Sequence, residues 1–205
     1  MTPMARLLDE GLASFGIDVP DVGRRQLLDY LRLLDHWNKS INLTGLRDPS
    51  TRLRRLVLEP IWAARKLRPQ GHYLDIGSGS GSPAIPWAVT AGFSSVVLVE
   101  SRGRRATFLE VLARQLGLDG VSVHAMRFNA LRAESLRPDW VTLQGVRLDR
   151  VLLGQIRRLN RDARVVWFTR NAALPEPPTM RLKIPESDRE AIVFSRDGRT
   201  PSGTR

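Results

Sequence analysis

The feature that most constrains this chain is a glycine-rich turn that directly follows an apolar run. Tyr73 to Pro86 reads YLDIGSGSGSPAIP, so the run ends near an acid, three glycines alternate with serines, and prolines follow. Glycine allows a tight turn with positive φ and lets a ligand lie against bare backbone. A strand, a glycine turn and a helix in this order indicate an α/β domain with a ligand at the carboxyl end of its sheet.

Strand and helix patterns alternate from this turn towards the C-terminus. Strands are expected over 72–76, 95–100, 121–126, 140–143 and 163–169, and helices over 83–91, 104–116 and 150–159. Residues 180–184 and 191–195 are expected to pair as antiparallel strands. The alternation predicts a mostly parallel sheet with helices on both faces.

The first part of the chain has apolar residues at helical spacing instead. Helices are expected over 5–15, from 21 onwards, and from a cap at Asp48 or Ser50 to Leu67, the last of them kinked or split at Pro60. We therefore expect a helical N-terminal cap over 1–70, a sheet domain over 71–197 and a disordered tail over 198–205.

Composition limits the classes of function. The chain has 205 residues and no cysteine, which excludes disulfides, thiolate metal sites and a cysteine nucleophile. The histidines (His36, His72 and His124) lack metal-ligand spacing, so no metal site is expected. No apolar run approaches the ~18 residues of a membrane span, and no secretory signal is expected, so the predicted location is the cytoplasm.

The chain is strongly basic, with a formal net charge of +11. Nearly all of the positive charge is arginine, whose rigid fork suits phosphates and guanine edges. RNA or DNA is therefore the favoured partner class, although a GC-rich genome that encodes arginine at most basic positions would give the same composition.

The spacing of the glycines separates the possible ligands. A dinucleotide site needs G-x-G-x-x-G, but here the third glycine comes one residue early and Ser82 stands in its place. A phosphate loop would carry a lysine after the glycines, and none is there. S-adenosylmethionine fits better, with Asp75 near its ammonium group and Glu100, at the end of the next strand, near its ribose hydroxyls. An ordinary tight turn without a cofactor is the alternative.

If the cofactor is a methyl donor, the residues of the chain also limit which methyl acceptor it can serve. Methylation of a pyrimidine carbon usually needs a cysteine, and the segment from Val141 to Gln144 does not match the motif of exocyclic amine transfer. Guanine N7 has its own lone pair and needs alignment rather than deprotonation, so we expect no general base and no catalytic residue of that kind.

Three segments together resemble the glucose-inhibited division protein B family, the guanine-N7 methyltransferases of 16S ribosomal RNA. WNKSINLT (37–44) is similar to W-N-x-x-x-N-L-T, LDIGSGSGSPAIP (74–86) to L-D-(I/V)-G-S-G-x-G-x-P-G-(I/V)-P, and LVESRGRRATFL (98–109) to L-(I/V/L)-E-S-x-x-K-K-x-x-F-L. The resemblance implies a class I S-adenosylmethionine-dependent methyltransferase fold, which is Rossmann-like, with S-adenosyl-L-methionine as donor. It also implies 16S ribosomal RNA or the 30S subunit as partner. We further expect a monomer with no membrane partner.

The motifs and the resemblance together give the expected site. The cofactor-binding residues are expected to be Asp75, Gly77, Ser78, Gly79, Gly81, Ser82, Glu100, Phe128, Asn129 and Gln144. The substrate contacts are expected to be Arg127, Arg104, Arg105 and Asn38, although Asn38 could instead fix its own turn and the two arginines of 104–105 could form a solvated helix start.

The chain departs from the family pattern on the substrate side. Gln144 stands where the family has an arginine, Asn129 where it has a glutamate, and Thr169 where it has a lysine. Two alternatives therefore stay open beside an active ribosomal RNA methyltransferase: a non-catalytic RNA-binding paralogue that keeps the fold, and a small-molecule methyltransferase.

Overall fold

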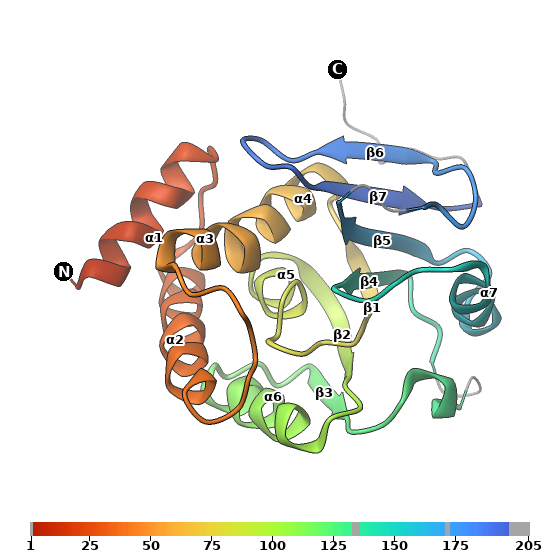
Figure 1. Cartoon of the computed structure of the whole chain (residues 1–205), viewed down its shortest axis with the longest axis horizontal. Helices are drawn as coiled ribbons and strands as arrows, with labels where there is room; N and C mark the ends of the chain where they lie inside the picture. The colour runs from red at the N-terminus through yellow and green to blue at the C-terminus, as the bar shows by residue number, and fades with distance from the viewer. Residues whose placement is uncertain (1, 133–135, 171–172, 197–205) are drawn as a thin grey trace.

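The described part of the chain, residues 2–132, 136–170 and 173–196 of a computed structural model, is built around a seven-stranded sheet (Figure 1). The strands are β1 (Gln70–Ile76), β2 (Gly92–Val99), β3 (Val121–His124), β4 (Trp140–Gln144), β5 (Arg164–Thr169), β6 (Met180–Lys183) and β7 (Glu190–Phe194). Their order is β3-β2-β1-β4-β5-β7-β6. The neighbouring pairs among β1 to β5 are parallel, and β7 is antiparallel to both β5 and β6.

This sheet confirms the predicted parallel arrangement and the predicted terminal antiparallel pair. The largest difference in a boundary is at β2, which starts at Gly92 rather than at Ser95. The extra residues pair with Gln70 and Gly71 of β1. Such cross-strand pairing lengthens a strand beyond what its own apolar pattern indicates.

Helices cover both faces of the sheet, as predicted. The cap helices, with α5 (Ala84–Thr90) and α6 (Gly103–Gln115), pack on one face, around Tyr73, Leu98 and Val166 of the strands. On the other face α7 (Arg150–Leu159) packs against residues such as Leu74 and Val97, and the short 3-10 helix η2 (Phe128–Ala130) adds Phe128. Figure 1 shows α7 on the side of the molecule opposite to the cap.

The cap contains α1 (Pro3–Ser14), α2 (Asp21–Asn38), α3 (Pro49–Leu53), the π-helical segment η1 (Arg54–Leu58) and α4 (Glu59–Leu67). Asp48 rather than Ser50 caps α3, because its carboxylate accepts a 2.7 Å hydrogen bond from the backbone N–H of Thr51. The kink expected at Pro60 takes the form of the π-helical turn just before it. Proline has no N–H and its ring clashes with the carbonyl group four residues back, so a wider turn accommodates it.

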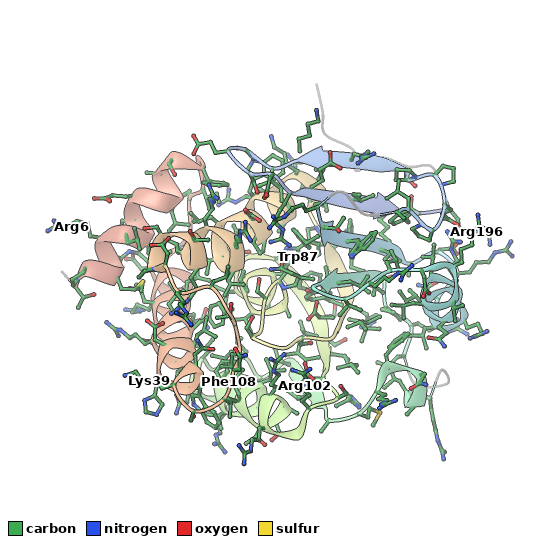
Figure 2. The ribbon with its side chains drawn as sticks, viewed as in Figure 1. Arg6, Lys39, Trp87, Arg102, Phe108 and Arg196 are labelled. Carbon is green, nitrogen blue, oxygen red and sulfur yellow. The ribbon has the colours of Figure 1, made fainter. Side chains whose placement is uncertain are left out.

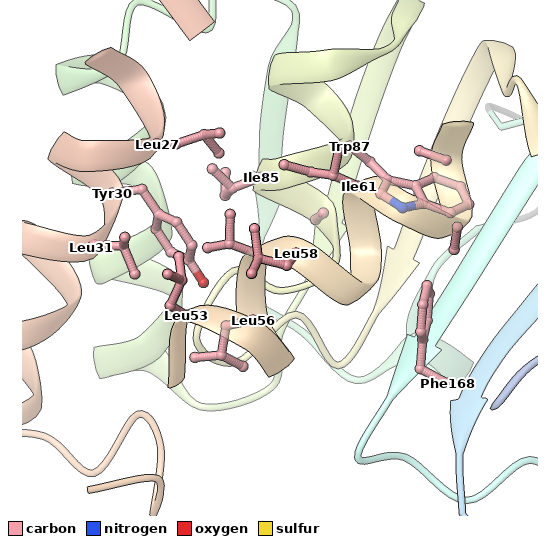
Figure 3. Packing of buried hydrophobic residues seen from close by; sticks show 14 of the residues in the cluster. Leu27, Tyr30, Leu31, Leu53, Leu56, Leu58, Ile61, Ile85, Trp87 and Phe168 are labelled. Carbon is pink, nitrogen blue, oxygen red and sulfur yellow. The ribbon is translucent and has the colours of Figure 1, made fainter. Parts of the chain in front are cut away.

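The cap and one face of the sheet share a single hydrophobic core (Figure 3). Figure 3 shows Leu27 and Tyr30 of α2 next to Ile85 of α5, with Leu58 of η1 and Ile61 of α4 between them and Trp87. Trp87 is fully buried and its indole N–H donates a 2.8 Å hydrogen bond to the carbonyl oxygen of Pro60. The cap is therefore fixed to the strand and helix that flank the glycine turn. The expected tail, 198–205, lies outside the described residues.

Candidate cofactor and substrate site

The glycine turn connects β1 to α5 and is held by backbone hydrogen bonds. The N–H groups of Gly77 and Ser78 donate to the carbonyl oxygen of Val99 at 2.8 and 3.2 Å. Gly77, Gly79 and Gly81 have φ values of 74°, 47° and 90°, which disfavour residues with a Cβ atom. At Gly77 a Cβ atom would also come within 2.5 Å of a methyl group of Val146, so glycine is needed there for space as well.

Asp75 lies at the end of β1, under the turn, and is almost completely buried, with 1% of its surface exposed. The hydroxyl group of Thr142 donates to its Oδ1 atom, and the hydroxyl group of Tyr73 lies 2.6 Å from that of Thr142. Its Oδ2 atom is buried and has no hydrogen-bond partner among the described residues. Burial, assisted by the charge of Glu100, raises the pKa of Asp75 to about 6.

Glu100 follows β2 and binds the turn directly. Its Oε2 atom accepts a 2.9 Å hydrogen bond from the N–H of Gly79, and its Oε1 atom accepts a 2.8 Å bond from the N–H of Arg102. A carboxylate offers about four acceptor positions, so each oxygen can accept one more bond. Asp75 and Glu100 thus lie at the ends of two adjacent parallel strands, with the three glycines between them.

The cap supports this turn through a residue that the sequence did not indicate. Tyr30 in α2 is fully buried, and its hydroxyl group donates a 3.1 Å hydrogen bond to the carbonyl oxygen of Ser80. On the other side, Arg105 of α6 donates to the carbonyl oxygen of Asn42 in the loop after α2. In the sequence Tyr30 is one more residue on an apolar helix face, and only a hydroxyl group on that face hinted at a polar partner.

Four more of the expected cofactor residues lie in two places, the glycine turn and η2. Ser78 and Ser82 are buried in the turn, where the hydroxyl group of Ser78 donates to the carbonyl oxygen of Asp75 at 3.2 Å. The hydroxyl group of Ser82 is buried and has no partner within the described ranges. Phe128 and Asn129 lie in η2 and line a small hollow of about 130 Å³ against α7.

The expected substrate residues also separate. Arg127 precedes η2 and Arg104 lies in the first turn of α6, and both are exposed. Arg105 is partly buried, and its guanidinium lies 3.6 Å from where a Cβ atom on Gly79 would be, so it borders the turn. The substrate roles of these arginines stay predictions.

Asn38 has a structural task. Its side-chain oxygen accepts hydrogen bonds of 2.9 Å from the N–H groups of Leu43 and Thr44, and its amide nitrogen donates to the carbonyl oxygen of Thr44 at 3.2 Å. Both polar ends of the side chain therefore hold the loop after α2. The alternative in which Asn38 fixes its own turn matches these contacts, and a substrate contact stays a prediction.

A cavity of about 630 Å³ opens at the carboxyl ends of β4 and β5. Gln144, Val146 and Arg147 line it from the loop after β4, and Trp167 and Arg170 from the end of β5. The cavity adjoins the glycine turn through Val146, whose methyl group lies next to Gly77. The indole N–H of Trp167 donates a 2.9 Å hydrogen bond to the carbonyl oxygen of Val146 and so fixes this shared wall.

Four arginines line this cavity, from η1, from the segments that follow β4 and β5, and from just before β7: Arg55, Arg147, Arg170 and Arg189. Their positions lie up to 134 residues apart in the chain, so no local sequence pattern indicates this cluster. Gln144 belongs to the same cavity, where its amide nitrogen lies 3.4 Å from the carbonyl oxygen of Arg55. Its expected cofactor contact stays a prediction.

The described residues also bear on two other kinds of feature, metal sites and membrane-spanning helices. Among the described residues, no group of three or more histidine, aspartate or glutamate side chains could hold a metal ion. No helix in the same ranges is long and apolar enough to cross a membrane.

Solved structures similar to this chain show the fold. A SAM dependent methyltransferase from Aquifex aeolicus matches with a TM-score of 0.57 at 14% identity, over 74% of this chain and 95% of that chain. A mutant of MtNAS in complex with S-adenosylmethionine matches with a TM-score of 0.56 at 18% identity, over 84% of this chain and 78% of that chain. The chain has the class I methyltransferase fold that the sequence predicted.

Curated relatives named ribosomal RNA small subunit methyltransferase G are similar in sequence. The relative from Yersinia enterocolitica is 39% identical over 118 residues, 58% of this chain and 57% of the relative. One from Klebsiella pneumoniae is 39% identical over 134 residues, 65% of this chain and 62% of the relative. The matches thus span about three fifths of these relatives. The family model of rRNA small subunit methyltransferase G matches residues 24–172, well over half of the chain, and the chain therefore belongs to this family.

Proposed function

We propose that this protein transfers a methyl group from S-adenosyl-L-methionine to N7 of a guanine in 16S ribosomal RNA. The observation that carries the proposal is the glycine turn with Asp75 below it and Glu100 bound to it, in a chain of the rRNA small subunit methyltransferase G family. The names of the curated relatives support the RNA substrate, and the complex of MtNAS with S-adenosylmethionine supports this fold as a binder of that cofactor.

The polar atoms of the turn fit the cofactor. The buried Oδ2 atom of Asp75 has no partner in the described chain and would bind an ammonium group. The free acceptor positions of Glu100 would bind ribose hydroxyls. A Cβ atom on Gly79 would contact Arg105 at 3.6 Å and Glu100 at 3.9 Å, so the glycine keeps this position next to Glu100 free of a side chain. The remaining contacts are assigned by the same proposal to Gly77, Ser78, Gly81, Ser82, Phe128 and Asn129.

The reaction needs little from the side chains beyond alignment. The cofactor supplies a methyl group on a positively charged sulfur, and guanine N7 supplies the lone pair that forms the new N–C bond while the C–S bond breaks. No proton has to leave N7 first, so no general base is required. The chain contributes by holding both reactants at a fixed distance and direction, which can lower a barrier by about 7–11 kcal/mol.

The charge of the chain suits an RNA partner. The formal net charge is +11, and Figure 2 shows basic side chains at widely separated places on the molecule, among them Arg6, Lys39, Arg102 and Arg196. Each phosphate that such a side chain neutralises releases counterions from the RNA and strengthens binding. The same proposal includes RNA contacts by Arg127, Arg104 and Arg105, a cytoplasmic location, a monomeric state, and 16S ribosomal RNA or the 30S subunit as partner.

Calorimetry with S-adenosyl-L-methionine tests the cofactor part. Glu100→Gln keeps the size of the side chain but places an amide nitrogen against one of two N–H donors, so we expect affinity to fall at least tenfold. Glu110→Gln, on the exposed surface of α6, is the matched control and should bind like the wild type. Failure of the folded wild type to bind the cofactor would refute the proposal.

Transfer of a tritiated methyl group to 30S subunits that lack the modification tests the acceptor part. We expect incorporation into 16S ribosomal RNA, located at a guanine N7 by cleavage at the modified base. A second candidate is a non-catalytic RNA-binding paralogue, which the replacement of the family arginine by Gln144 favours. That candidate predicts cofactor binding and RNA binding with no incorporation above background.

A further inference from the structure

We propose that the cavity at the ends of β4 and β5 takes one unpaired guanine of the RNA, and that Gln144 and Arg55 recognise its edge. This inference rests on the proposed function and assigns its acceptor site to particular residues. It also moves Gln144 from the expected cofactor contacts to the acceptor. The cavity of about 630 Å³ lies within the range of about 300–1,000 Å³ that is usual for small-ligand sites.

Two residues that line the cavity each have a buried polar atom without a partner. The Oε1 atom of Gln144 and the Nε atom of Arg55 are buried, and neither has a hydrogen-bond partner in the described chain. A buried polar atom without a hydrogen bond is unfavourable, so a ligand that pairs with both atoms would bind more tightly. The orientation of the amide of Gln144 is fixed, because its nitrogen faces the carbonyl oxygen of Arg55 at 3.4 Å and a flipped amide would bring two oxygens together.

An acceptor on Gln144 and a donor on Arg55, two residues in contact through the Arg55 carbonyl group, match the Watson–Crick edge of guanine. Its N1–H group can donate to the oxygen of Gln144, and its O6 atom can accept from the Nε–H group of Arg55. The bond to O6 is charge-assisted and therefore the stronger of the two. Neither bond uses N7, whose lone pair stays free for the methyl group.

The other residues that line the cavity are suited to an unstacked base. Leu56, Val146, Trp167 and Phe168 give the cavity apolar surface, and Val146 also touches the glycine turn at Gly77. A base seated here would lie beside the proposed cofactor site. Enzymes that act on a base inside a closed pocket take it unpaired or extruded, so the target is expected in a single-stranded or loop segment.

The charges around the cavity suit the phosphates on either side of such a base. Asp188 accepts from Arg170 at 3.1 Å and lies 3.7 Å from Arg55, while Glu59 pairs with Arg189 at 3.2 Å. Four arginines against these two carboxylates leave two positive charges in excess. Arg147 and Arg170 are exposed at the cavity and are placed to bind phosphates.

The variant Gln144→Leu tests whether Gln144 recognises the edge of the guanine base. We expect its affinity for S-adenosyl-L-methionine, measured by calorimetry, to stay within twofold of the wild type. Its kcat/KM for methyl transfer to unmodified 30S subunits should fall about tenfold or more, since the N1–H group of the bound guanine would lose its partner. Gln115→Leu, at the exposed end of α6, is the matched control and should keep both values. An equal loss of cofactor affinity in Gln144→Leu, or no loss in either measurement, would overturn the inference.

A second measurement does not depend on catalysis. Saturation-transfer NMR should detect binding of guanosine 5′-monophosphate to the wild type and lose most of the signal in Gln144→Leu and Arg55→Lys. The nucleotide 1-methylguanosine 5′-monophosphate, which lacks the N1–H group, should also bind weakly. Equal signals from the two nucleotides, or none from guanosine 5′-monophosphate, would overturn the inference. If the wild type binds the base and transfers no methyl group, the proposed function fails while the site stands.

Discussion

The hydroxyl group of Tyr30 in α2 donates a 3.1 Å hydrogen bond to the carbonyl oxygen of Ser80 in the glycine turn. The two residues are fifty positions apart, and Tyr30 is fully buried. Burial raises the pKa of Tyr30 well above its usual value, so the hydroxyl group keeps its proton and can donate at any pH used for experiments. The cap therefore supports the turn directly.

Tyr30→Phe removes this hydrogen bond and keeps the ring. We expect about 1–2 kcal/mol less stability in urea unfolding, because the carbonyl group of Ser80 loses its partner, and a cofactor affinity several-fold lower. Val193→Ala in β7, buried and far along the sheet from β1, is a control for stability loss alone. If Val193→Ala weakens cofactor binding as much as Tyr30→Phe does, the turn gains nothing specific from Tyr30.

The affinity for S-adenosyl-L-methionine should depend on pH through Asp75, whose pKa is raised to about 6, mainly by burial. An ammonium group binds the ionised carboxylate, so affinity should rise with pH and be about tenfold weaker at pH 5 than at pH 7.5. Titration calorimetry across this range measures it. Asp75→Asn should show a flat profile, and a wild type with a flat profile would exclude Asp75 as the ammonium partner.

The same raised pKa predicts how stability changes with pH. Between pH 4 and 6 folded Asp75 holds a proton that the unfolded chain, with a carboxyl pKa of 3.8, has mostly released. The contribution of Asp75 to the free energy of unfolding should therefore decrease as pH rises through this window. Subtracting the urea-unfolding curve of Asp75→Asn from that of the wild type isolates this contribution, and an increase over the window would contradict the assignment.

Gly77→Ala should destabilise the protein and weaken cofactor binding. Its φ of 74° costs a residue with a Cβ atom about 1–2 kcal/mol, and the new methyl group would also press on Val146. Gly154→Ala is the matched change in α7, where a Cβ atom has no neighbour within 4 Å. It should raise stability by about 0.5–1 kcal/mol and leave binding unchanged. Thermal unfolding of both variants measures the change in stability, and calorimetry measures the change in cofactor affinity.

Arg189→Met should be the most destabilising of these changes. It leaves Glu59, which is fully buried, with the hydroxyl group of Ser187 as its one remaining side-chain partner among the described residues. Breaking a buried ion pair in this way costs about 3–5 kcal/mol. The double variant Glu59→Gln with Arg189→Met removes the unpaired charge and should recover much of the loss in urea unfolding. A double variant as unstable as Arg189→Met alone would show that the buried charge is not the cause.

Features that depend on neighbouring residues were predictable. The glycine turn, the acids at the ends of β1 and β2, and the sequence of strands and helices follow from spacing and local backbone preference. The kink at Pro60 followed from the chemistry of proline, although its π-helical form did not. The cap of α3 was narrowed to Asp48 or Ser50, and the 2.7 Å bond to Asp48 decided between them.

By itself the sequence determined the fold class, the site of the glycine turn and the kind of ligand that this turn suits, because these depend on contacts within a few residues. Only the tertiary structure decided that Tyr30 supports Ser80, that Arg189 pairs with Glu59, and that Gln144 and Arg55 share one cavity. These partners lie 50, 130 and 89 residues apart. No local pattern encodes such a contact, because it forms only when packing of the sheet and the cap brings the two segments together.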